Sequence, residues 1–230
     1  MNWVVSFAKS SIGAKALVAL TGFLLVGFVV QHMVAHLQMF GGPEVYNAYA
    51  AGLKSLGPLL WVARLGLLGV FVLHIATAVR LQAMNKAARP VTYQSKKSQA
   101  SSLASRSMLL GGALLLLFVL YHLGHFTIGL TNPEFLTLKD AAGRHDAYRM
   151  TVLGFQHVAL VVLYIAAMGV LSLHLSHGVS SMFQTLGLNH PRYRPLIEWV
   201  GPVIAGVTFL GYITIPIAVQ LGVLTTTPLP

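Results

Sequence analysis

Five long apolar runs dominate the sequence, at about residues 16–40, 59–84, 107–130, 151–176 and 199–224. Each is long enough to cross a hydrocarbon core, which takes about 20 residues of helix. Charged residues make up 9% of the chain, against about 25% in soluble domains. We therefore expect an all-α integral membrane protein, folded as one domain over residues 1–230 with five transmembrane helices.

The first run is longer than the apolar core of a signal peptide, about 7–15 residues, so we expect it to remain as a membrane span. Ten basic residues are expected on the side of the membrane that carries the N-terminus, and five on the opposite side. The ten are Lys9, Lys15, Arg80, Lys86, Arg89, Lys96, Lys97, Arg106, Arg192 and Arg194, and the five are Lys54, Arg64, Lys139, Arg144 and Arg149. This bias predicts a cytoplasmic N-terminus and an external C-terminus.

Cysteine is absent, which excludes thiolate zinc sites, covalently attached haem and cysteine-ligated iron–sulfur clusters within this chain. The formal net charge is +10. Because the basic residues lie in the connections between apolar runs, we interpret this charge as a topology signal and a contact for anionic lipid or a protein partner. It does not indicate binding of nucleic acid.

Four of the five runs contain histidine, and an imidazole inside hydrocarbon needs a polar partner or a metal. If helices one and three rise from the inside while two and four descend, His32 and His122 lie in the outer half, and His74 and His174 in the inner half. Two such pairs at different depths suit two stacked haem b groups, each with two axial histidines. An iron with both axial positions filled transfers electrons and does not bind oxygen.

Other interpretations of these histidines stay open. Any one intramembrane histidine could bond a carbonyl of a neighbouring helix. His36, His125 and His177 each follow a ligand candidate by about one helical turn, and could support a ligand, contact a quinone or lie in water. The fifth run has no histidine, so the expected architecture is a four-helix haem-binding bundle completed by a fifth helix.

Two stretches carry a family resemblance. The first comprises Ser10–Lys15, Leu20–Gly22, His32 and Phe40–Tyr49, which reads FGGPEVYNAY, and the second is His174–Gly187, which reads HLSHGVSSMFQTLG. Together they resemble the dihaem cytochrome b subunit of succinate dehydrogenases and fumarate reductases, of the type with a single five-helix anchor. The resemblance extends over nearly the whole chain.

This resemblance implies that His74 and His174 ligate the haem proximal to an iron–sulfur subunit, and that His32 and His122 ligate the distal haem. It further implies a bacterial cytoplasmic membrane, a flavoprotein and an iron–sulfur protein on the cytoplasmic face, and menaquinone as the electron partner. Such a subunit does not itself oxidise succinate, and a higher oligomer is compatible with it.

Further site residues follow from position. Lys15 and Arg106, at the inner ends of helices one and three, are candidates for contacts with haem propionates. His36, His125 and Arg64 are candidates for the quinone site, because a quinone carbonyl needs a donor as negative charge develops. All five acids lie outside the expected spans, so no carboxylate relay across the membrane is expected; they are Glu44, Glu134, Asp140, Asp146 and Glu198.

Two alternative functions remain. The chain could serve another dehydrogenase, such as a hydrogenase or a formate dehydrogenase, through a similar bis-histidine cytochrome. Outside electron transfer, it could be a histidine-lined metal transporter, which would bind divalent metal and show no haem spectrum.

Overall fold

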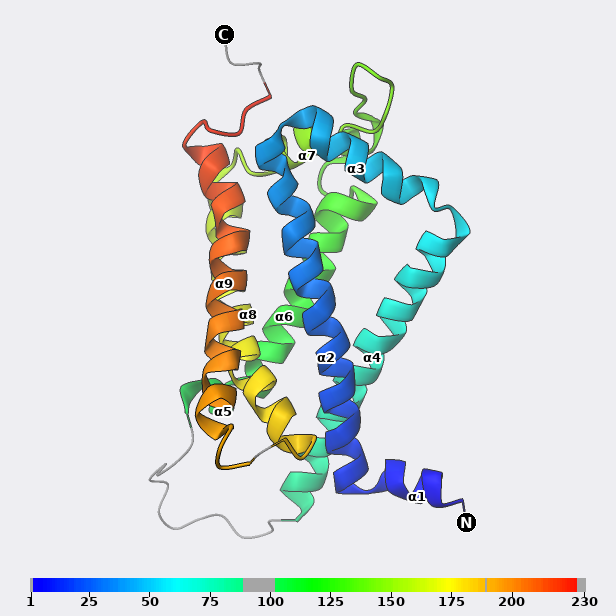
Figure 1. Ribbon diagram of the computed structural model, residues 1–230. Helices are drawn as coiled ribbons and strands as arrows, with labels where there is room; N and C mark the ends of the chain where they lie inside the picture. Colours follow the sequence, from blue (N-terminus) through cyan, green and yellow to red (C-terminus); the bar gives the residue numbers. More distant parts are fainter. Residues whose placement is uncertain (1, 89–101, 189, 227–230) are drawn as a thin grey trace.

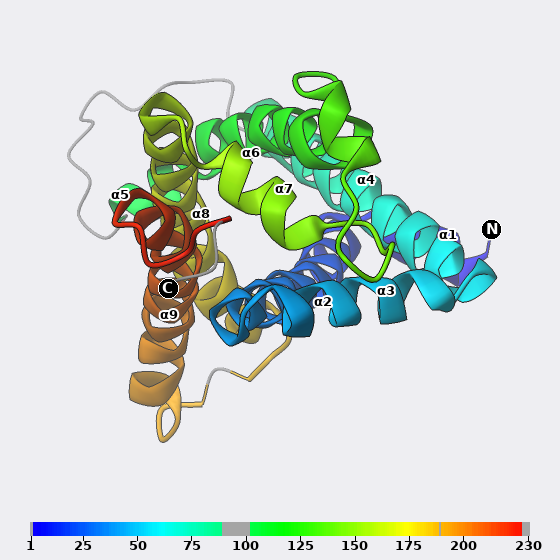
Figure 2. The same cartoon turned by 90° about the horizontal axis from the view of Figure 1, so that it is seen from above.

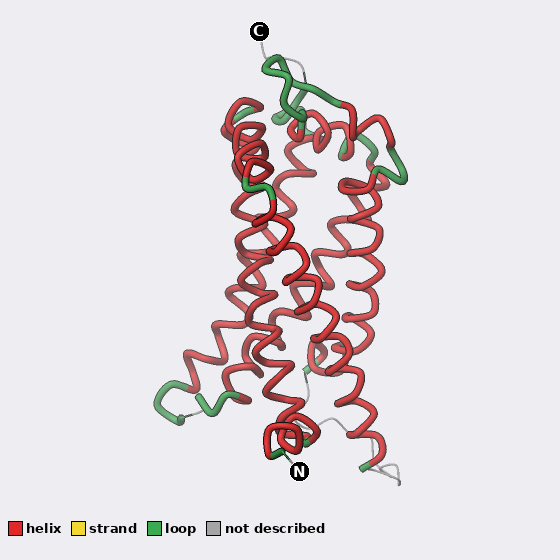
Figure 3. Tube along the Cα trace, turned by 90° about the vertical axis from the view of Figure 1, so that its right-hand side faces the viewer, coloured by secondary structure: helices red, strands yellow, loops and turns green. Residues whose placement is uncertain are grey.

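The computed structural model describes residues 2–88, 102–188 and 190–226, and throughout these it is helical apart from short connections. Five long apolar helices could cross a membrane, and they extend over Ser11–Gly41, Pro58–Ala87, Met108–Ile128, Val158–Thr185 and Arg194–Gln220. The expected fold class, an all-α protein with five membrane spans, is confirmed. The long helices run side by side, with the N-terminus at one end of the bundle and the C-terminus at the other (Figures 1 and 3).

The elements follow in chain order. They are α1 (Trp3–Lys9), α2 (Ser11–Leu37), the 3-10 turn η1 (Gln38–Gly41), α3 (Pro43–Ser55), α4 (Pro58–Ala87), α5 (Leu103–Arg106), α6 (Met108–Leu123), the π-helical turn η2 (Gly124–Ile128), the 3-10 turn η3 (Pro133–Thr137), α7 (Ala147–Gly154), α8 (Val158–Thr185) and α9 (Arg194–Gln220). We call the end with the N-terminus the lower end and the other the upper end, as in Figure 1.

Local sequence sets the helix boundaries. The Ser10 side chain caps α2 by accepting a hydrogen bond of 3.0 Å from the Gly13 N–H, as short hydroxyl side chains do at helix starts. At the other end Gly42 adopts φ +88°, a conformation open mainly to glycine, and Pro43 then occupies the first turn of α3. Gly57 and Pro58 repeat the arrangement before α4, with Gly57 at φ +53°. The chain therefore turns sharply at both ends of α3.

Helix α2 occupies the middle of the bundle and packs against α4, α8 and α9, while α6 packs against α8. The closest pair is α8 and α9, where a Cβ at Gly201 would overlap the Ser176 carbonyl and the Ser180 hydroxyl. Helix α4 is different: it leans away from the bundle toward its upper end (Figure 1). Within α4, all of which is described, only Thr77 is buried.

The fourth span differs from the expected range of about 151–176. Thr151 belongs to the separate short helix α7, and α8 runs from Val158 to Thr185. Two features explain the break. A Cβ at Gly154 would lie 2.6 Å from the Phe126 ring, so the chain at Gly154 approaches η2 too closely for a side chain to fit there. The amide of Gln220 on α9 donates to the carbonyls of Phe155 (2.7 Å) and Gln156 (3.1 Å), groups that an unbroken helix would have satisfied itself.

Helices α3 and α7 lie across the upper end of the bundle (Figure 2). Asn47 joins them, because its amide donates to Asp146 Oδ1 at 2.9 Å and its carbonyl oxygen accepts from the Tyr148 N–H at 2.9 Å. Arg144 adds ion pairs to Glu44 (2.5 Å) and Asp140 (2.7 Å). We call this assembly of α3, α7 and their polar contacts the upper cap.

Candidate functional site

Apart from His177 on α8, the histidines of the membrane-spanning helices fall into two groups. The lower pair consists of His74 on α4 and His174 on α8, and the upper cluster consists of His32 and His36 on α2, His122 on α6 and His125 in η2. The upper cluster lies where α2 and α6 approach the upper cap, whereas the lower pair lies in the halves of α4 and α8 that lead to the lower end (Figure 1). The groups therefore occupy different levels of the bundle.

In the lower pair, the side chain of Thr21 fixes the orientation of His74. His74 Nδ1 lies 3.0 Å from Thr21 Oγ1. The Thr21 hydroxyl donates its one proton to the Leu17 carbonyl at 2.6 Å, so it can only accept from the imidazole. His74 is therefore protonated on Nδ1, and its Nε2 carries the free lone pair that a metal requires.

The Nδ1 of His174 is buried without a hydrogen-bond partner. A Cβ at Gly112 would lie 3.7 Å from His174 Cε1, and a Cβ at Gly22 would lie 3.4 Å from His74 Cε1. A glycine thus lies directly beside each imidazole. A cavity of about 80 Å³ between α6 and α8 is bounded by His174, Gly111 and Val170.

In the upper cluster, the rings of His32 and His122 face one another across α2 and α6. Their centroids are 6.1 Å apart and their planes are nearly perpendicular, at 85°. A metal–imidazole bond of about 2 Å on each side of one metal places two ring centres roughly 6 Å apart. The spacing of this pair therefore suits two axial ligands on one iron.

His36 connects this pair to the upper cap. Its Nε2 lies 3.2 Å from His32 Nε2, and its Nδ1 lies 2.7 Å from the hydroxyl of Tyr46 on α3. Burial raises the pKa of Tyr46 to about 12, so this phenol keeps its proton at neutral pH and can donate it to His36. His36 thus bridges α3 and His32.

Tyr164 on α8 bridges the other two histidines. Its hydroxyl lies 3.3 Å from His122 Nδ1 and 3.1 Å from His125 Nδ1. Having one proton, the hydroxyl donates to one ring and accepts from the other. His125 is fully buried, packs against Phe126 with ring centroids 4.0 Å apart, and leaves its Nε2 without a partner. It sits in a π-helical turn, a feature frequent at functional sites.

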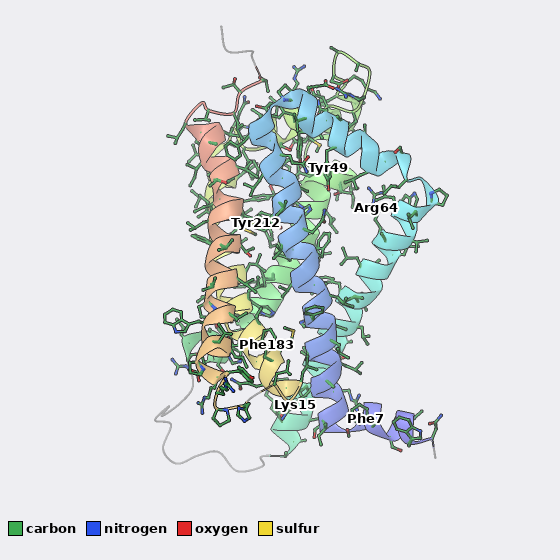
Figure 4. All side chains as sticks on the ribbon, viewed as in Figure 1. Phe7, Lys15, Tyr49, Arg64, Phe183 and Tyr212 are labelled. Carbon is green, nitrogen blue, oxygen red and sulfur yellow. The ribbon has the colours of Figure 1, made fainter. Side chains whose placement is uncertain are left out.

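The expected propionate contacts and one expected quinone contact have exposed side chains. Lys15 is exposed near the lower end of α2, and Arg106 is exposed in α5. Arg64 is exposed at the upper end of α4, where its guanidinium lies 5.2 Å from the Trp61 ring centre (Figure 4). His125, an expected quinone contact, has no exposed surface. Arg89, Lys96 and Lys97, expected on the cytoplasmic side, lie outside the described residues.

Residue chemistry and placement both fit haem. The described chain offers imidazoles from different helices, buried nitrogens without partners and glycines beside the rings. Among the described residues, no three His, Asp or Glu side chains converge closely enough to hold a metal ion by themselves. The histidine pairs expected from the sequence stay a prediction.

Three polar residues of the site were missed at the sequence level: Thr21, Tyr46 and Tyr164. Thr21 and Tyr164 lie within apolar runs, and a polar group in hydrocarbon requires a partner. Their depths match those of His74 and His122, which is the signal that could have paired them. Tyr46 gave no such signal, because the fold of α3 over the bundle was not foreseen.

Comparison with known proteins gives one partial similarity. Over 61 residues the chain is 38% identical to the succinate dehydrogenase hydrophobic membrane anchor subunit of Halobacterium salinarum. The aligned part covers 26% of this chain and 46% of that protein, less than half of its length. No family model matches the chain, and no solved structure matches it. The similarity to a succinate dehydrogenase anchor is therefore distant and partial.

Proposed function

We propose that this chain is the membrane anchor and cytochrome b subunit of a succinate:quinone oxidoreductase, a succinate dehydrogenase or fumarate reductase. The observation that carries the proposal is the presence of two histidine groups at different levels of one five-helix bundle, each drawn from different helices. The partial similarity to a succinate dehydrogenase anchor subunit supports it independently.

In this proposal His74 and His174 hold one haem b, and His32 and His122 hold the other. Bis-histidine haem supplies one-electron transfer with no open iron position. The chain's own residues hold each imidazole in place: Thr21 orients His74, and Tyr164 orients His122. The apolar helices exclude water from both groups.

The remaining parts are assigned by position. Lys15 and Arg106 serve as contacts for haem propionates, and the exposed charges of the lower end meet the iron–sulfur and flavoprotein subunits on the cytoplasmic face. Menaquinone is the proposed electron partner, following the family resemblance. Arg64 and His36 are its candidate contacts near the upper end, whereas we assign His125, which has no exposed surface, to supporting Tyr164.

The decisive test measures haem in the purified full-length protein. The dithionite-reduced minus oxidised spectrum, with extracted haem quantified per polypeptide, should reveal two b-type haems. One haem would mean that one histidine pair is misassigned. A folded, haem-supplied protein without haem would refute the cytochrome proposal and leave the divalent metal transporter as the function to test.

A second measurement separates the proposed enzyme from other dehydrogenases. The proteins that copurify with the chain from its native membrane should include a flavoprotein that oxidises succinate. Copurification of a hydrogenase or a formate dehydrogenase would instead assign the same dihaem bundle to a different electron donor.

A further inference from the structure

We propose that Thr21 is a positioning residue that holds His74 in the Nδ1-protonated form and thereby lowers the reduction potential of the haem at the lower pair. This inference rests on the proposed function, since it concerns the haem that His74 would ligate. It goes further because it assigns control of the reduction potential of one haem, and not of the other, to a residue that is not a ligand.

The hydrogen-bond distances favour one proton arrangement. Thr21 is 5% exposed, and its hydroxyl lies 2.6 Å from the Leu17 carbonyl and 3.2 Å from the Val18 carbonyl. Carbonyls only accept, so the hydroxyl proton is directed at them. The contact of 3.0 Å between Thr21 Oγ1 and His74 Nδ1 must then be a bond that the imidazole donates.

The Val18 carbonyl reinforces this arrangement. It lies 3.2 Å from the Thr21 hydroxyl, so the Thr21 proton has a second acceptor on α2 beside the Leu17 carbonyl. The lone pairs of Thr21 Oγ1 then remain for a proton from His74 on α4. His74 keeps its Nε2 lone pair free.

Helix α4 has few other means of fixing this ring. In α4, which is described throughout, Thr77 is the only buried residue, and α2 is the helix against which α4 mainly packs. The bond from His74 to Thr21 is thus a principal link between the two helices at this depth. Gly22, the neighbour of Thr21, lets α2 approach the ring closely, since a Cβ there would lie 3.4 Å from His74 Cε1.

A hydrogen bond donated by the outer nitrogen of a metal-bound histidine makes the ligand more basic. A more basic ligand favours ferric over ferrous iron, so the bond to Thr21 should lower the potential. Loss of such an outer contact typically changes metal affinity by about 10- to 100-fold. If the preference for ferric iron weakens about tenfold, the one-electron reduction potential rises by about 59 mV.

The test is a potentiometric titration of both haems in Thr21→Val, which keeps the shape of threonine but removes the hydroxyl. The haem of the lower pair is identified by its loss in His174→Ala. We expect that haem to stay bound. Its potential should rise by up to about 59 mV, which corresponds to a tenfold weaker preference for ferric iron, while the potential of the other haem stays the same. Thr21→Ser should restore the original potential.

Thr208→Val is the matched control. Thr208 is 2% exposed on α9, and its hydroxyl is buried without a partner, so its removal should alter neither potential. If the lower haem has the same potential in Thr21→Val as in the unsubstituted dihaem protein, the role of Thr21 is overturned while the proposed function stands. Haem loss that Thr21→Ser does not reverse would have the same consequence. An unsubstituted protein without haem would overturn the proposed function and this inference with it.

Discussion

In the upper cluster each of the four imidazoles has a hydrogen-bonded neighbour: His32 contacts His36, His36 contacts Tyr46, and His122 and His125 share Tyr164. In the lower pair, His74 is held by Thr21, whereas His174 Nδ1 is buried with no partner. One group is organised by the protein's own polar side chains and aromatic rings. The other leaves its second imidazole unheld.

The surroundings of the two groups follow the same contrast. The upper cluster lies beneath a cap in which Asn47 bonds Asp146 and Arg144 pairs with Glu44. Near the lower pair the described helices offer small residues, with Gly22 and Gly112 beside the rings. We therefore expect the upper cluster to keep its shape without haem, and the lower pair to depend on haem for its order.

The largest effect should come from removing a ligand of the lower pair. His74→Ala should lower the haem content from two to one per polypeptide and leave the haem at His32 and His122 in place, because the groups share no residue. Extracted haem and the reduced-minus-oxidised spectrum measure this. His190→Ala, a change at an exposed histidine, should retain both haems. Retention of both haems in His74→Ala would remove His74 from the ligand set.

The upper cap should be the next most sensitive region. Asn47 is 1% exposed, and Asn47→Ala leaves the Tyr148 N–H without its partner and removes one of the two hydrogen bonds that Asp146 Oδ1 accepts. Unsatisfied buried groups cost about 1–3 kcal/mol each, so we expect a loss of about 2–3 kcal/mol in the free energy of unfolding. Thermal unfolding in detergent measures it.

The comparison variant for Asn47 is Asn132→Ala. Asn132 donates at 3.0 Å to Glu134 at an exposed position, where water can replace the lost partner, so stability should hardly change. The haem of the upper cluster should dissociate at a lower temperature in Asn47→Ala, while that of the lower pair should not. Equal loss from both groups would contradict the separation of the upper cap from the lower pair.

How far the sequence predicted these regions depends on the kind of contact involved. The five spans followed from apolar length, and the structure has five such helices. The upper cap did not follow, because Asn47 is far in the chain from Asp146 and Tyr148 and meets them only when α3 and α7 fold over the bundle. The break before Val158 was hidden for the same reason, since Phe126 and Gln220 cause it from other helices.

The site shows the same division. Histidine depth grouped His32 with His122, and the structure brings their rings to 6.1 Å; ligation by either remains a prediction. The hydroxyl partners depend on the rotation of each helix about its axis. The apolar pattern fixes that rotation poorly in a membrane, where lipid and protein are equally apolar. The contacts of Thr21 and Tyr164 with the histidines could therefore be recognised only in the structure.

Tyr164→Phe tests whether the upper cluster is held as a unit. The change removes the hydroxyl shared by His122 and His125 and leaves two buried nitrogens without it, so we expect about 1–2 kcal/mol of destabilisation. The potential of the upper haem should also shift while that of the lower haem does not. Thermal unfolding and potentiometry measure the two effects.

Tyr49→Phe is the control for Tyr164→Phe. The Tyr49 hydroxyl accepts a bond of 3.1 Å from the exposed amide of Gln31, so its loss should change neither stability nor potential. A shift of both haem potentials in Tyr164→Phe would show that the two groups are coupled, against the comparison drawn above.

The smallest effect concerns pH and the ion pairs of the upper cap. The hydrogen bond from Arg144 lowers the pKa of Glu44 below its ordinary value. A carboxyl whose pKa is lower in the folded state contributes stability above its unfolded pKa, about 4.3, and loses that contribution as the pH falls through the folded pKa.

The stability of the cap should therefore decrease below about pH 4.3, and the decrease should be smaller in Glu44→Gln. Because the Glu44 side chain is 79% exposed, salt should weaken the difference. Thermal unfolding followed from pH 6 downward, at low and high salt, measures it, and an identical pH profile in Glu44→Gln would show that this ion pair does not stabilise the cap.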